Sequence, residues 1–111
     1  MVRELSRAEW LSGDGIFTAG EVGFCRFSRS PARHFAACFA AKEAAMKALG
    51  LRVSDLAMFR EIEVEHGTGR KVGVTLHGRL KTESERLGVR CIHLSFARCA
   101  GRAEAVVILE A

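Results

Sequence analysis

The chain has 111 residues, the length of one small domain, and 49% of them are hydrophobic against 27% charged, as in ordinary globular proteins. One proline, 11 glycines and no low-complexity tract exclude a collagen-like or proline-rich chain. The longest apolar stretch, Phe35 to Ala41, is far shorter than the roughly 20 residues of a membrane-spanning helix. The first residues alternate charged and apolar side chains without a secretory leader, so we expect one domain over residues 1–111 in the cytoplasm.

The cysteines and the charge narrow the class of protein further. Cys25, Cys38, Cys91 and Cys99 contain no C-x-x-C pair, so we expect reduced thiols that behave as small apolar side chains. The net charge is +4, and 13 of the 17 cationic residues are arginine, which suits phosphate and carboxylate groups. This charge is compatible with nucleic acid, a phosphorylated small molecule, an acidic protein partner, or a basic surface without a specific ligand.

Two helices are expected in the first half of the chain. Thr18 and Glu21 have the spacing of a capping box, which predicts a short helix that runs through Phe27. Ser30-Pro31 predicts a longer helix to Leu49, with serine as the N-cap and Gly50 just beyond the C-terminus. Apolar residues at helical spacing mark one face of this helix: Phe35, Cys38, Phe39, Met46 and Leu49.

The second half changes to the period of two that is typical of strands. Apolar residues alternate at Ile62 and Val64 and again at Val72, Val74 and Leu76, with a turn at residues 67–70, which predicts a hairpin. A helix is expected from Arg79 to Leu87, followed by strands at Cys91–Phe96 and Ala103–Leu109. Helices first and antiparallel strands later indicate an α+β domain.

The most informative residues are Lys42, Glu43 and Lys47 on the long helix. Lys42 falls within the apolar face, where a charge is costly unless it has a partner. Glu43 and Lys47 stand at i and i+4, which allows an ordinary surface ion pair that contributes about 0.3–0.5 kcal/mol. Alternatively, Glu43 holds a hard cation and the lysines contact phosphate oxygens. Mg²⁺ favours that combination of carboxylate, water and phosphate.

Residues 39–50 resemble the signature F-A-A-K-E-A-x-x-K-A-x-G of holo-acyl-carrier-protein synthases, which are small 4′-phosphopantetheinyl transferases. Further runs resemble the same family, and together they span roughly Ile16 to Glu110. These runs are Ile16-Phe17-Thr18-x-x-Glu21-x-x-x-Cys25, Arg29-x-Pro31-Ala32-x-His34-Phe35-Ala36, Ile62-Glu63-Val64, Gly69-Arg70, Leu76-His77-Gly78, Leu87-Gly88, Ile92-His93-Leu94-Ser95 and Ala105-Val106-Val107-Ile108.

The resemblance implies one phosphopantetheinyl-transferase-like domain, with an antiparallel sheet packed on the long helix. It implies Mg²⁺-dependent transfer of 4′-phosphopantetheine from coenzyme A to a serine of an acyl carrier protein, with release of adenosine 3′,5′-bisphosphate. The implied roles are metal ligand and catalytic residue for Glu43, and catalytic and coenzyme A-binding residue for Lys47. Either Glu43 or a water on the metal accepts the serine proton. The other implied coenzyme A contacts are Lys42, Arg29, Arg33, Gly69, Arg70, Ser95 and Arg98. A compact homotrimer with active sites between subunits is implied as well.

The sequence departs from the family pattern in several places. The family has a first strand with G-[IL]-D, whose aspartate is a second metal ligand, and no such run stands in this sequence. Asp14 and Asp55 are the two aspartates, and Asp14 is a weak substitute ligand. Cys38 replaces a frequent arginine. The frequent S-x-S-H run reads Ser95-Phe96-Ala97-Arg98, and Gly-Lys-Pro reads Gly69-Arg70-Lys71.

Three hypotheses of different classes follow. The first is an active Mg²⁺-dependent transferase that acts on an acyl carrier protein. The absence of the G-[IL]-D run then has two competing explanations, a strand encoded upstream of Met1 or divergence from the family. The second is a diverged, non-catalytic relative that binds coenzyme A or carrier protein without turnover. The third, a small basic nucleic-acid-binding domain, rests on charge alone. With one Trp, no Tyr and no interleaving of aromatic and basic residues, we expect no nucleic-acid partner. The short apolar stretches predict no membrane partner.

Overall fold

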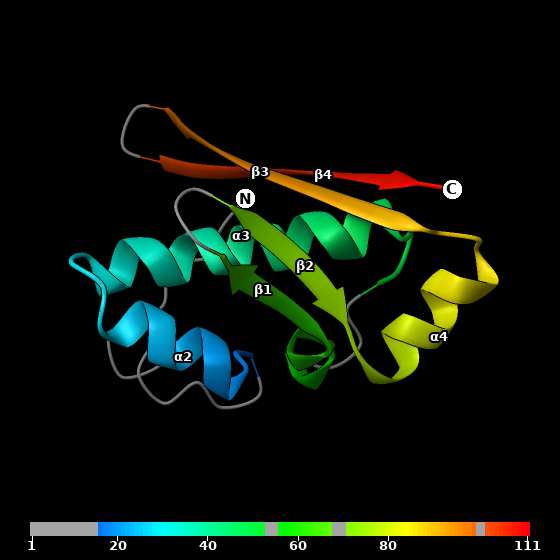
Figure 1. Cartoon of the computed structure of the whole chain (residues 1–111), viewed down its shortest axis with the longest axis horizontal. Coiled ribbons are helices and arrows are strands. Elements are labelled where there is room, and N and C mark those ends of the chain that lie inside the picture. Colours follow the sequence, from blue (N-terminus) through cyan, green and yellow to red (C-terminus); the bar gives the residue numbers. More distant parts are fainter. Residues whose placement is uncertain (1–15, 53–55, 68–70, 100–101) are drawn as a thin grey trace.

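The computed structural model of the chain describes residues 16–52, 56–67, 71–99 and 102–111 (Figure 1). Its first described helix is α2 (Ala19–Arg26), and its N-terminus has the expected capping box. Thr18 Oγ1 accepts a hydrogen bond from the Glu21 backbone N–H at 3.2 Å, and the Glu21 carboxylate accepts one from the Thr18 N–H at 2.8 Å. Phe27 is the C-cap, so the predicted end of this helix is confirmed to within one residue.

The long helix α3 (Pro31–Ala48) begins with proline at its first position, as predicted. Ser30 occupies the N-cap position, as predicted. Its side chain makes no capping hydrogen bond, so the prediction that this serine caps the helix is wrong. At the other end, Leu49 is the C-cap, and Gly50 has a φ of +72°, a conformation that favours glycine. The predicted apolar face is confirmed, since Phe35, Cys38, Phe39, Met46 and Leu49 are all buried.

After α3, a 3₁₀ helix, η1 (Leu56–Glu61), leads into the expected hairpin of β1 (Ile62–His66) and β2 (Val72–Leu76). The two strands are antiparallel, with Ile62 opposite Leu76 and Val64 opposite Val74. Next, α4 (Gly78–Arg86) lies one residue ahead of its predicted bounds and is followed by Gly88, whose φ is +78°.

The chain ends in a long hairpin of β3 (Cys91–Cys99) and β4 (Arg102–Glu110), with Cys91 opposite Glu110 and Cys99 opposite Arg102. Both strands are longer than predicted, because backbone pairing continues past the residues that alternate in polarity. One face of this hairpin packs against the core through partly buried hydrophobic residues: Ile92, Leu94, Phe96, Ala105, Val107 and Leu109. The opposite, outer face carries exposed residues, including His93, Ser95, Val106, Ile108 and Glu110.

Helix α3 packs against both hairpins, through β1 and β4, and β2 also lies against β3 (Figure 1). Seven alanines between Ala36 and Ala48 keep α3 slim where the strands approach. The expected α+β class, with antiparallel strands on a long helix, is confirmed, although the strands form two separate two-stranded sheets. None of the described helices has the length and apolarity needed to cross a membrane. Cys25, Cys38 and Cys91 are free thiols, as expected.

Candidate active site

Helix α3 places the three residues of the signature in three different environments. Lys42 is completely buried, Glu43 is half-buried and Lys47 is exposed. A helix turns by about 100° per residue, so Lys42 faces the core, whereas Glu43 and Lys47 lie one turn apart towards its polar side. The helix therefore buries the charge of Lys42 and leaves the charges of Glu43 and Lys47 accessible to a ligand.

The Lys42 ammonium is held by three acceptors inside the protein. Its Nζ lies 2.7 Å from a carboxylate oxygen of Glu21, donates to the Phe59 carbonyl at 2.7 Å, and also donates to the carbonyl of Ile62. An ammonium has three N–H donors, and all three are used here. The expectation that a charge at this position needs a partner is therefore confirmed.

Glu21 is the partner, and it is completely buried as well. Its carboxylate accepts hydrogen bonds from the backbone N–H groups of Thr18 at 2.8 Å and Val64 at 2.7 Å, besides its ion pair with Lys42. Burial lowers the pKa of Lys42, and the neighbouring Glu21 carboxylate opposes that shift. The pair joins α2, α3, η1 and β1, and the sequence identified Glu21 only as part of a capping box.

The buried contacts of Lys42 determine whether its ammonium can reach a ligand. With no exposed surface and every N–H donor used, Lys42 has no group left to offer a coenzyme A phosphate. These buried contacts favour a role for Lys42 in positioning α3.

Glu43 and Lys47 do not form the surface ion pair that their spacing allows. Among the ion pairs of the described residues, none within 4.0 Å joins these two side chains. Glu43 is thus a half-buried carboxylate beside an exposed ammonium. Carboxylate oxygen is a ligand that Mg²⁺ prefers, so Glu43 fits the expected metal by donor type and accessibility.

Arg29 and Arg33 lie near the opposite end of α3, and both are exposed. At 1.5 Å per residue, Arg33 is roughly 15 Å along the helix axis from Glu43. The two arginines are therefore available to an anion but do not surround the same point as Glu43 and Lys47.

Position 38, where the family often has arginine, contributes to the core. Cys38 Sγ lies 3.7 Å from Cys25 Sγ, and both thiols are buried. Contact with Cys25 and burial raise the pKa of the Cys38 thiol well above its usual range, so it stays uncharged. This residue supplies packing and has no charge to offer a phosphate.

The remaining expected ligand contacts come from the last hairpin and from segments outside the described residues. Ser95 is exposed on the outer face of β3, whereas α3 packs on the inner face of the same hairpin. One copy of the chain therefore does not bring Ser95 beside Glu43. The expectations for Gly69, Arg70, Asp14 and Asp55, and for the Arg98 side chain, lie outside the described residues.

Comparison with known proteins identifies the family. The sequence model of the 4′-phosphopantetheinyl transferase superfamily matches residues 3–97. The holo-[acyl-carrier-protein] synthase of Moorella thermoacetica is 38% identical over 95 residues, which are 86% of this chain and 73% of that relative.

Two solved structures agree with the sequence comparison. The Mycobacterium tuberculosis acyl carrier protein synthase is 37% identical with a TM-score of 0.65, over 96% of this chain and 91% of that one. The holo-[acyl-carrier-protein] synthase of Neisseria meningitidis is 26% identical with a TM-score of 0.80, over 96% and 83%. The chain belongs to the 4′-phosphopantetheinyl transferase superfamily and is an enzyme of the transferase class, which confirms the family and the fold expected from its motifs.

Proposed function

We propose that the chain transfers 4′-phosphopantetheine from coenzyme A to a serine of an acyl carrier protein in the cytoplasm. The observation that carries this proposal is the geometry of the signature on α3, where Glu43 is half-buried and Lys47 is exposed one turn later. Relatives that match most of this chain bear the name holo-[acyl-carrier-protein] synthase.

The reaction is an in-line attack of the serine hydroxyl on the β-phosphorus of a diphosphate, which depends mainly on positioning and charge neutralisation. Glu43 would hold Mg²⁺, and this ion supplies positive charge against the diphosphate when it is bound. The Lys47 ammonium contacts phosphate oxygens directly. Glu43 itself, or a water on the ion, would accept the serine proton.

The other coenzyme A contacts are proposed to come from two parts of the fold. Arg29 and Arg33 bind the adenosine 3′-phosphate from the exposed start of α3. Ser95 is proposed to belong to a second wall of the site, and Gly69, Arg70 and Arg98 stay proposed contacts on the resemblance alone. Since Ser95 lies on the outer face of its hairpin, we propose that this wall comes from a neighbouring copy in a homotrimer.

The activity is tested by incubating the chain with coenzyme A, Mg²⁺ and an apo-acyl carrier protein, and then weighing the carrier. The expected result is a gain of one phosphopantetheine group per carrier, with an established synthase as the positive control. Binding of coenzyme A without any gain of mass would favour the non-catalytic relative over the transferase.

The role of Glu43 is tested by titrating coenzyme A with and without Mg²⁺. In the Glu43→Gln variant, the affinity for coenzyme A should cease to depend on Mg²⁺, because the cation loses its carboxylate. Lys47→Ala should weaken coenzyme A in both conditions, because its ammonium meets phosphate directly.

The matched controls are Glu85→Gln and Lys81→Ala, two exposed residues on α4, and both should behave as the wild type. Wild-type binding that is already independent of Mg²⁺ would refute the metal role of Glu43.

A further inference from the structure

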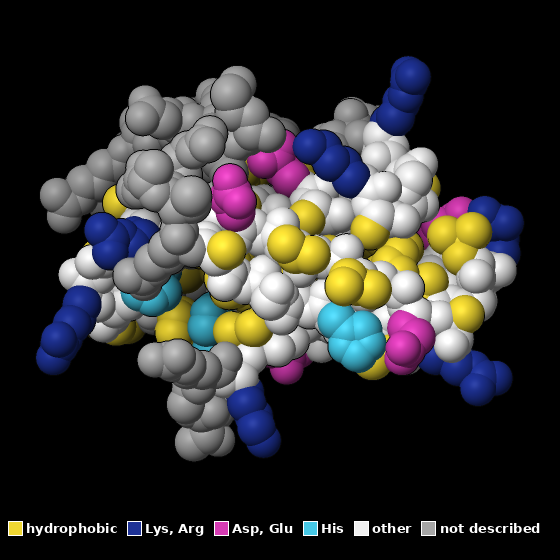
Figure 2. All heavy atoms as spheres, turned by 90° about the horizontal axis from the view of Figure 1, so that it is seen from above, with side chains coloured by type: hydrophobic (Ala, Val, Ile, Leu, Met, Phe, Trp, Pro, Cys, Tyr) yellow, Lys and Arg dark blue, Asp and Glu magenta, His cyan; other side chains and the backbone are white. Residues whose placement is uncertain are grey.

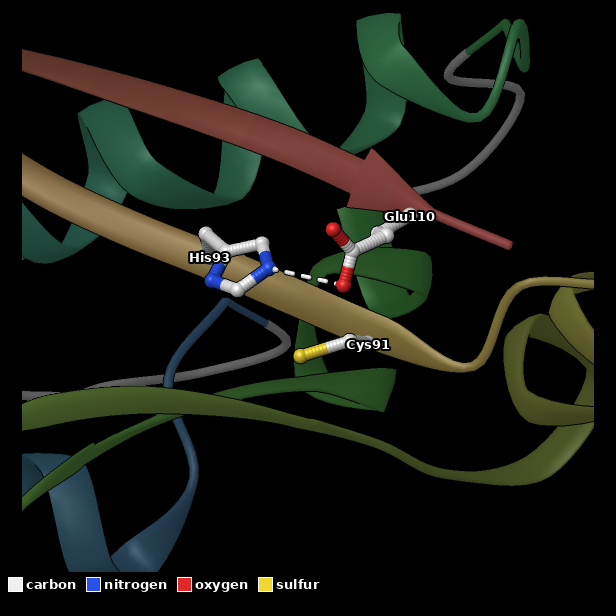
Figure 3. Close-up of side chains that lie close together, drawn as sticks. All are labelled: Cys91, His93 and Glu110. Carbon is white, nitrogen blue, oxygen red and sulfur yellow. Dashed lines mark ion pairs between the residues drawn. The ribbon is translucent and has the colours of Figure 1, made fainter.

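A group of metal-ligating side chains lies at the open end of the last hairpin, on the face opposite to the one that packs towards α3. Cys91 begins β3 and stands directly opposite Glu110, the last residue of β4. His93 lies two residues further along β3 and so shares the outer face with them. Figure 3 shows the three side chains on the same side of the ribbon. Their ligand atoms all lie within 4.8 Å of one another, and His93 Nε2 is 3.5 Å from Glu110 Oε1.

We propose that Cys91, His93 and Glu110 bind a zinc ion. Thiolate, imidazole and carboxylate are the three protein ligands of Zn²⁺, whereas Mg²⁺ prefers oxygen alone. Zinc–ligand bonds of about 2.0–2.3 Å bring the ligand atoms of a tetrahedral site within about 4 Å of one another. A small rotation of the side chains closes the remaining gap, and a water fills the fourth position.

The exposure of the side chains makes that rotation possible. Within one copy of the chain, the His93 side chain is 52% exposed and that of Glu110 is 66% exposed, so neither is held by packing against its own fold. The strands already supply the backbone positions of all three ligands through the pairing register. Zinc would join the first residue of β3 to the last residue of β4 and so stabilise the C-terminal strand.

A second histidine–carboxylate pair provides an internal comparison. His77 Nε2 lies 3.0 Å from Glu63 Oε1, also at the surface. Among the described residues, this pair has no third metal-ligating side chain close enough to complete a site. A thiolate is therefore the feature that distinguishes the proposed zinc site from an ordinary surface pair.

The experiment uses the full chain, kept reduced with a phosphine that does not bind metals, and titrates it first with Co²⁺ and then with Zn²⁺. The expected result is one Co²⁺ per chain, with a thiolate-to-cobalt charge-transfer band and the intense visible bands of tetrahedral coordination, all of which Zn²⁺ removes. A cobalt complex without the thiolate band, or with one metal for several chains, would overturn the proposal.

Variants locate the site. Substituting residues that only contact the ligands of a metal already lowers metal affinity by about 10- to 100-fold. Removing a ligand should cost more, so we expect Cys91→Ser and His93→Ala each to lower the zinc affinity by about 100-fold or more. Glu110→Gln should lower it by less. His77→Ala should bind as the wild type. Zinc binding that survives the Cys91→Ser/His93→Ala double variant would refute the site. Circular dichroism of each variant shows whether it has folded. We expect that it has, because His93 and Glu110 are exposed and Cys91 is only half-buried.

Discussion

At the scale of single residues, the buried pair of Glu21 and Lys42 is the feature with the largest energetic consequence. Removing two charges from water costs several kcal/mol per ion, and only good geometry with further hydrogen bonds offsets that cost. Both conditions are met, because the carboxylate accepts two backbone N–H groups and the ammonium donates to two backbone carbonyls. The pair therefore makes the packing of α3 specific, next to the residue proposed to hold the metal.

We predict that Lys42→Met destabilises the protein by about 3–5 kcal/mol, because it leaves the Glu21 carboxylate buried without its cation. Unfolding in urea measures this free energy. Lys81→Met, at an exposed position on α4, is the control and should change it by no more than about 0.5 kcal/mol.

The double variant Glu21→Gln/Lys42→Met distinguishes the loss of the ion pair from the loss of side-chain packing. If the two charges stabilise each other, the double variant costs less than the sum of the two single variants. Additive effects, or a Lys42→Met variant as stable as the wild type, would show that the pair contributes little to folding.

At the scale of elements, α2 is joined to β1 by an aromatic contact as well as by Glu21. The Phe24 ring stacks on His66 with centroids 3.7 Å apart and an angle of 7° between the planes. Burial lowers the pKa of His66, and the nearby His34 lowers it further. The folded protein therefore favours the neutral imidazole at this contact.

This shift predicts how stability depends on pH. Because the folded-state pKa of His66 lies below its ordinary value of about 6.5, the unfolded chain takes up the proton first as the pH falls. The contribution of His66 to stability is therefore present above its unfolded-state pKa of about 6.5 and is lost progressively as the pH falls from there through the lower folded-state pKa. His66→Phe keeps an aromatic ring against Phe24 but cannot titrate.

Unfolding free energies at about pH 8 and about pH 5.5 test this prediction. The wild type should lose more stability than His66→Phe over this interval, and equal losses in the two proteins would contradict the assignment.

At the scale of the whole molecule, the outer face of the last hairpin exposes two large hydrophobic side chains to solvent. Val106 is 52% exposed and Ile108 is 58% exposed on the same face of β4. Figure 2, seen from above this hairpin, shows hydrophobic side chains gathered along the middle of the view, with Lys and Arg towards the edges. Such a patch is typical of a surface that contacts another protein. It supports the proposed association of three copies.

We predict that the wild type sediments with three times the mass of one chain. Ile108→Glu should shift the protein towards the single-chain mass, because it places a charge within the apolar patch. Glu104→Gln, at an exposed position on the same face, is the control and should leave the assembly intact. A wild type that sediments as a stable monomer would refute both the trimer and the proposed second wall of the site.

Local interactions explain why much of the fold was predictable. The capping box at Thr18 and Glu21, the proline at the start of α3 and the glycines beyond α3 and α4 act within a few residues of themselves. Hydrophobic periodicity identified the buried face of α3 and the alternation of β1 and β2. The motif in residues 39–50 identified the family, because a signature is a property of the sequence itself.

Contacts between residues far apart in the chain required the tertiary structure. The apolar face of α3 showed that Lys42 needed a partner, but only the packing of α2 against α3 selected Glu21. Cys91 and His93 are two residues apart, so the sequence already predicts that they share a strand face. Glu110 joins them only through the strand register. The same packing left Ser95 on the far side of its hairpin from α3. The sequence by itself determined the elements and their buried faces, because backbone capping and periodicity are local. Only the tertiary structure decided which charges meet, because it alone brings distant segments together.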